Sequence, residues 1–190
     1  MGREDDLLRQ RLRLVAHGRG KDMANRIRLP HEGEWVDRLL REVKDAVWET
    51  RTVVIADVKV TYSICDPWPL GGEIAIYDHD GDIYLPESYV RSHPSNADLV
   101  AYHEQIEIGH KLAGRSHAYA HRRALLMELL AAKQSYDEVG LRAYVHQRVF
   151  GYPDWKIPDK DAIEERLYEL LSADRPLRGR LIAVITEAKM

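Results

Sequence analysis

One segment of the chain concentrates residue types that bind metals and move protons. Four of the nine histidines lie within the 19 positions from His103 to His121. On a helix, His103 and Glu107 are four residues apart, so they would project from one face and offer a nitrogen and a carboxylate oxygen to the same cation. Glu104 directly follows His103, so its side chain would point about 100° away from that of His103. It could act as a general base on a metal-bound water.

A third ligand must come from the segment that follows, because metal sites in proteins hold at least three side chains. A turn at Gly114 would fold a second helix back on the first, so that His121 or His117 approaches the pair. Glu128, seven residues past His121, is a candidate fourth ligand or an acceptor for an imidazole N–H. His110 shares the first helix face but would lie about 10 Å along its axis. The expected ligands are His103, Glu107 and His121, with Glu128, His117 and His110 as candidates for additional or supporting groups.

The elements before this segment change from helical to extended. Apolar residues at helical spacing over 34–49 predict an amphipathic helix. Apolar and polar residues alternate over 52–64, which predicts one half-buried antiparallel strand. The dipeptide Asp80-Gly81 favours the positive φ angles of a tight turn and therefore predicts a hairpin. Its two strands would be 73–77 and 82–85.

Helices account for most of the chain after this hairpin. Ser95 or Asn96 can cap the first of them, and Gly114 can end it. Ser116 can cap the second. The expected helices are 97–113, 116–134, 137–149, 160–172 and 178–188.

This order of elements predicts an α+β fold, with a small antiparallel sheet packed against helices and a helical C-terminal half. We expect a basic N-terminal arm at 1–31 and one α+β domain carrying the metal site at 32–150. Residues 151–190 would be a helical extension of the same domain, since they are too few to form a domain of their own.

Composition excludes several classes of protein. The chain has 190 residues, of which 45% are hydrophobic and 31% charged, as in an ordinary globular protein. No apolar run approaches the roughly 18 residues that span a membrane, and acidic residues stand where a secretory signal would be basic. Cys65 is the only cysteine, so no internal disulfide can form and a reducing cytoplasm is expected. Any metal must then be held by histidines and carboxylates.

The charge of the chain is uneven. Residues 1–31 hold eight Lys or Arg and four Asp or Glu, a balance of +4, which leaves −7 for the rest of a chain of net charge −3. Such an arm could contact nucleic acid phosphates, although a solvated arm is the commoner meaning of a charge run. The rival interpretation is a non-catalytic regulatory module that binds nucleic acid or a partner through this arm.

Other residues of interest have simpler explanations. The acidic run at 78–82 lacks the spacing of a calcium loop and fits a hairpin turn. Cys65 has no neighbouring base in sequence, so a small buried hydrophobe is expected rather than a nucleophile. For His103, Glu104 and Glu107, the simple alternative is an exposed helical face with polar contacts between successive turns.

The stretch from about 52 to 130 resembles the zincin metallopeptidases, whose active-site helix carries His-Glu-x-x-His beneath an antiparallel sheet. The resemblance implies a zincin-like minimal core, with His103 as first ligand, Glu104 as general base and His121 as downstream ligand. Glu107 departs from the pattern, because it stands where zincins have their second histidine, giving His-Glu-x-x-Glu. The resemblance implies a peptide or protein substrate.

The segment is also similar to small proteins that combine His-Glu-x-x-Glu, a glycine and Tyr-x-x-Ala-His, although Tyr119 lies two residues before His121 rather than four. Two imidazoles and one carboxylate suit Zn²⁺ with one open position, and they also suit Fe²⁺ or Mn²⁺. The sequence thus predicts a metal-dependent hydrolase, with hydrolysis of peptide bonds as the leading activity. It leaves open whether the protein forms homo-oligomers.

Overall fold

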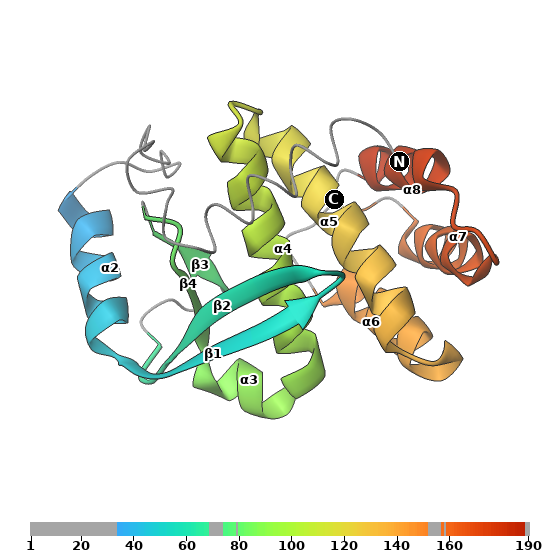
Figure 1. Ribbon diagram of the computed structural model, residues 1–190. Helices are drawn as coiled ribbons and strands as arrows, with labels where there is room; N and C mark the ends of the chain where they lie inside the picture. Colours follow the sequence, from blue (N-terminus) through green and yellow to red (C-terminus); the bar gives the residue numbers. More distant parts are fainter. Residues whose placement is uncertain (1–33, 69–73, 79, 152–156, 158, 189–190) are drawn as a thin grey trace. The chain divides into compact units, whose positions relative to one another are not determined.

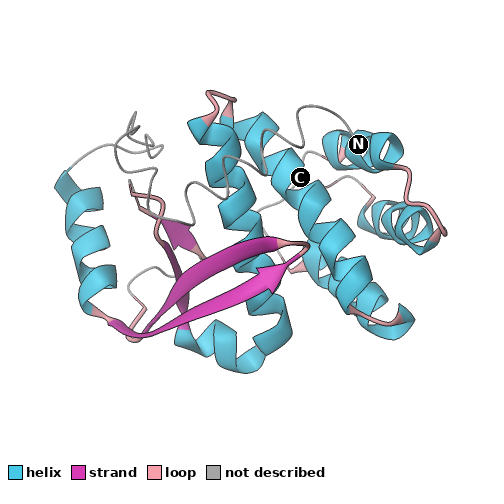
Figure 2. Ribbon diagram, in the orientation of Figure 1, coloured by secondary structure: helices cyan, strands magenta, loops and turns pink. Residues whose placement is uncertain are grey.

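The computed structural model describes residues 34–68, 74–78, 80–151, 157 and 159–188, and these form an α+β fold with a four-stranded sheet (Figures 1 and 2). The expected basic arm at 1–31 lies outside the described residues. The elements in chain order are α2 (Glu34–Asp45), β1 (Val47–Ile55), β2 (Val58–Cys65), β3 (Ile76–Tyr77), β4 (Ile83–Pro86), α3 (Glu87–Ser92), α4 (Pro94–Leu112), α5 (His117–Ser135), α6 (Glu138–Phe150), α7 (Lys160–Ser172) and α8 (Arg178–Glu187).

The chain divides into two compact units, Met1–Ala120 and His121–Met190. The first contains the sheet together with α2, α3 and α4. The division falls inside α5, so the first turn of that helix belongs to the first unit, and His121 follows it without a break in the helix.

The sheet is mixed, with strand order β1-β2-β4-β3. The pair β3–β4 is antiparallel, as predicted for that hairpin, and β1 and β2 also pair antiparallel, whereas β2 and β4 run parallel. One pair of the expected antiparallel sheet is therefore parallel. After β2 the chain forms β3 at the far edge and turns back into β4 between them, and a two-residue alternation does not reveal strand direction.

The first strand begins earlier than the sequence predicted, at Val47. The helix expected over 34–49 ends at Asp45, and the single strand expected over 52–64 is two strands joined by a tight turn at Ala56 and Asp57. These two residues have φ angles of 47° and 66°, which non-glycine residues rarely adopt, so the turn carried little sequence signal. The turn also leaves Val54 71% exposed rather than on the buried face.

Helix α4 is the central element of the first unit and packs on strands β1, β2 and β4. The Tyr62 hydroxyl of β2 donates to Asp98 Oδ1 of α4 at 2.7 Å, which ties the helix to the sheet. From Leu99 to His110 every residue of α4 is buried except Glu104, which is half-buried. A helix buried on nearly all sides must give each of its polar side chains a partner.

The second hairpin is fixed by a buried carboxylate. Asp78 accepts hydrogen bonds from the backbone N–H groups of Asp80 and Asp82 at 2.9 and 3.0 Å. Its other oxygen lies 2.6 Å from Lys44 Nζ of α2 and accepts from the Tyr84 hydroxyl at 3.1 Å. Burial next to this carboxylate raises the pKa of Tyr84. The acidic run is thus a hairpin turn, as predicted.

Helices α4 and α5 are joined by a short turn. Gly114 has a φ angle of +77°, and Ser116 Oγ accepts from the Tyr119 backbone N–H at 3.4 Å. The predictions that Gly114 ends one helix and that Ser116 caps the next are confirmed. Helix α4 starts at Pro94, three residues earlier than expected, because proline is well tolerated in a first helical turn.

The second unit is helical, as predicted. Asp137 and Asp159 cap α6 and α7 by accepting from the backbone N–H groups of Gly140 and Ala162. Within the described residues, none of the helices combines the length and the apolarity that a membrane crossing requires.

Replacement by alanine should change the free energy of unfolding in opposite directions at two glycines. At Gly114 a Cβ would meet no atom, but the left-handed backbone penalises it, so Gly114→Ala should lower the free energy of unfolding by about 1 kcal/mol. Gly179 lies inside α8 in open space, so Gly179→Ala should raise the free energy of unfolding by about 0.5 kcal/mol. Urea unfolding measures both, and equal effects would contradict the assignment of the Gly114 turn.

Candidate metal centre

Two of the predicted ligands meet on α4. His103 and Glu107 are only 3% and 4% exposed, and His103 Nε2 lies 3.6 Å from Glu107 Oε2. The helical spacing of four residues accounts for their common face. The alternative of an exposed polar face was wrong, because both side chains are buried.

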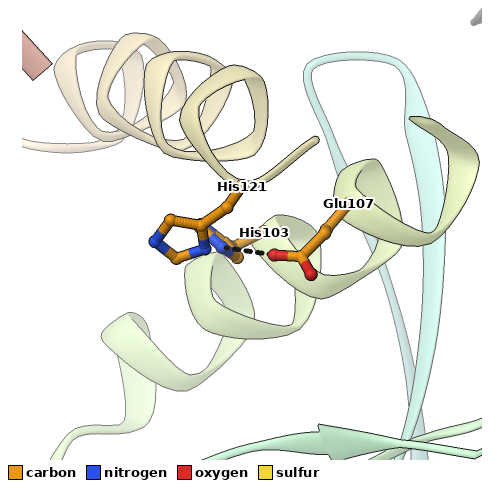
Figure 3. Close-up of side chains that lie close together, drawn as sticks. All are labelled: His103, Glu107 and His121. Carbon is orange, nitrogen blue, oxygen red and sulfur yellow. Dashed lines mark ion pairs between the residues drawn. The ribbon is translucent and has the colours of Figure 1, made fainter. Parts of the chain in front are cut away.

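His121 completes the group. One potential ligand atom from each of His103, Glu107 and His121 lies within 4.8 Å of the other two, and their side chains converge in Figure 3. His121 is half-buried and follows directly on the first turn of α5. Ligand atoms of a four-coordinate zinc ion stand about 3.4 Å apart at bond lengths of 2.0–2.2 Å, so small rotamer changes of the side chains would suffice.

The donor set fits a divalent transition metal. Two imidazoles and one carboxylate with an open fourth position form a usual catalytic zinc set, and the same set accepts Fe²⁺ or Mn²⁺. The residues that could hold the ion are thus those expected from the sequence.

The other oxygen of Glu107 has its own partners. Oε1 accepts from the Tyr77 hydroxyl at 3.2 Å, and it lies 2.7 Å from Lys111 Nζ and 3.2 Å from His117 Nδ1. Lys111 Nζ also donates to the Tyr77 hydroxyl. The two oxygens of this carboxylate therefore face different surroundings, with Tyr77, Lys111 and His117 around Oε1 and His103 towards Oε2.

Tyr77 and Lys111 were missed by sequence reasoning. Lys111 is four residues after Glu107, so the helical spacing that paired His103 with Glu107 would have found it. Tyr77 comes from β3 and gives no local signal, since only the sheet topology places it against α4. Burial raises the pKa of Tyr77, and the negative charges of Glu107 and Glu104 add to that rise.

Glu104 lies beside the ligand group without belonging to it. Its side chain is half-buried on α4, and its charge acts on Tyr77, whose hydroxyl touches Glu107.

The remaining candidates take other places. The side chain of His117 is 68% exposed, yet it contacts Glu107 and so could orient that ligand. His110 is buried with its ring edge-to-face against Tyr119 at 5.4 Å between centroids. Glu128 is fully buried, accepts from the Tyr144 hydroxyl and pairs with Arg148 at 2.8 Å. Neither His110 nor Glu128 is part of the three-residue group.

Comparison of the chain with protein-family models, curated proteins and solved structures finds no match. The resemblance to zincins therefore rests on the motif residues.

Cys65 is a buried residue of the core. Its thiol is fully buried, and its sulfur lies 3.5 Å from the Val43 carbonyl oxygen of α2. Burial raises the pKa of this thiol to about 11. The prediction of a small buried hydrophobe is confirmed.

At pH 7.5 iodoacetamide should alkylate Cys65 at least about 100-fold more slowly in the native protein than in denaturant, because both burial and a low thiolate fraction protect it. Mass spectrometry of timed samples measures the two rates. Rapid modification of the native protein would contradict the burial of this thiol.

Proposed function

We propose that the protein is a metal-dependent hydrolase that cleaves amide bonds in a peptide or protein substrate. The observation that carries the proposal is the convergence of ligand atoms from His103, Glu107 and His121 within 4.8 Å. Glu104 directly follows His103 in the chain. The substrate class follows from the resemblance of the motif to that of zincin metallopeptidases.

The buried charge of Glu107 is already balanced by Lys111, so burial by itself does not call for a metal. What supports a metal is the approach of two imidazoles to the same carboxylate, which offers three ligand atoms to one cation. Zn²⁺ is the ion that the donor set favours most, and Fe²⁺ and Mn²⁺ are alternatives. A bound zinc ion would act as a Lewis acid and lower the pKa of its water to about 7.

Glu104 has the proton-transfer role in this proposal. Its carboxylate would take a proton from the attacking water as the oxygen adds to the substrate carbonyl carbon. The same proton would then pass to the amide nitrogen as the carbon–nitrogen bond breaks, so that the products are an amine and a carboxylic acid, which loses its remaining proton to solvent at neutral pH. Glu107 and the two histidines would hold their positions throughout.

Metal content tests the site directly. Protein purified without an affinity tag should hold close to one equivalent of Zn²⁺, Fe²⁺ or Mn²⁺, and both His103→Ala and His121→Ala should lose it, because each removes one of three ligands. His146→Ala, at an exposed histidine of α6, is the matched control and should keep the metal. Wild-type protein that takes up none of the three ions, even when they are added, would refute the proposal.

Activity tests the general base. Glu104→Gln should retain the metal and lower kcat for a susceptible peptide roughly 100- to 10,000-fold, because the amide cannot accept the proton. A mixed peptide library analysed by mass spectrometry identifies the substrate first. Full activity in Glu104→Gln would remove this residue from the mechanism.

A further inference from the structure

The three donors on Glu107 Oε1 bear on how this carboxylate could bind a metal. The Tyr77 hydroxyl, the Lys111 ammonium and His117 Nδ1 all lie between 2.7 and 3.2 Å from that one oxygen. Oε2 instead faces His103 Nε2 at 3.6 Å. All of these residues belong to the first unit, on β3, on α4 and in the first turn of α5.

We propose that Tyr77 and Lys111 are positioning residues that make Glu107 a ligand through one oxygen only, and that they thereby set the metal preference of the site. The inference rests on the proposed function, since it concerns how the same site takes its ion. With Oε1 held by these groups, the cation would be bound by Oε2, the oxygen that faces His103.

The number of oxygens that a carboxylate offers affects which ion fits. One oxygen and two imidazoles leave a zinc ion four-coordinate with a single open position. A carboxylate that binds through both oxygens raises the coordination number, and higher coordination with oxygen suits Mn²⁺ better than Zn²⁺. Holding back Oε1 therefore favours zinc.

The protein contains a matched control. Asp78 is bound by a tyrosine hydroxyl and a lysine ammonium as well, from Tyr84 and Lys44. Tyr84 and Tyr77 are both buried tyrosines of the β3–β4 hairpin. Removing either hydroxyl deletes one buried hydrogen bond to a carboxylate. Of the two tyrosines, Tyr77 contacts Glu107, the proposed ligand, and Tyr84 contacts Asp78.

The experiment compares Tyr77→Phe and Lys111→Met with Tyr84→Phe and Lys44→Met. Apparent Kd values for Zn²⁺ and Mn²⁺ are measured by competition with a chromophoric chelator, and thermal melting is recorded for each variant. The ratio of the two Kd values is the main readout, because removal of the Lys111 charge affects both divalent ions alike and cancels in the ratio. The visible spectrum of the Co²⁺-loaded protein reports coordination number, since four-coordinate Co²⁺ absorbs more strongly than five-coordinate Co²⁺.

We expect Tyr77→Phe and Lys111→Met each to reduce the preference for Zn²⁺ over Mn²⁺ at least about tenfold and to weaken the Co²⁺ bands, as loss of groups that orient a ligand does. The Asp78 variants should leave both readouts at the wild-type value. An unchanged ratio and spectrum in both Glu107-side variants would overturn the inference, even if His103→Ala still abolishes binding and the proposed site stands. If the wild type binds none of these ions, the proposed function fails and the inference fails with it.

Discussion

A buried carboxylate on a buried helix is the constraint on which the site depends. Glu107 lies in the stretch of α4 that packs against the sheet, where an unpaired charge would cost several kcal/mol. Its partners come from three elements: Tyr77 from β3, Lys111 and His103 from α4, and His117 from the first turn of α5. These partners hydrogen-bond the buried carboxylate and balance its charge. They also leave its two oxygens in different surroundings.

The mixed sheet makes this arrangement possible. Because β4 returns between β2 and β3, the short β3 occupies an edge from which Tyr77 reaches α4. The turn that reverses the chain is fixed by Asp78, which binds two backbone N–H groups, a lysine and a tyrosine. Tyr62 of β2 holds α4 on the same sheet through Asp98.

The chemistry proposed for the site follows from the contrast between neighbouring carboxylates on one helix. Glu107 is buried and fixed by several donors, which suits a ligand that must not move. Glu104 is half-buried three positions earlier, which suits a group that exchanges protons with water. Residues three apart on a helix point about 60° from each other, so the two carboxylates leave α4 in different directions.

Local patterns determined much of this protein. The spacing of His103 and Glu107, the turn at Gly114 and the cap at Ser116 depend on residues close in the chain. The sequence therefore predicted the candidate ligand pair on α4 and the helix α5 that follows it. Tertiary structure decided the rest. The parallel pairing of β2 with β4 and the approach of Tyr77 to Glu107 depend on contacts between distant residues, and a periodic pattern of side chains contains no information about which strands pair or in which direction. The turn at Ala56 and Asp57 is local, but it has φ angles that non-glycine residues rarely adopt.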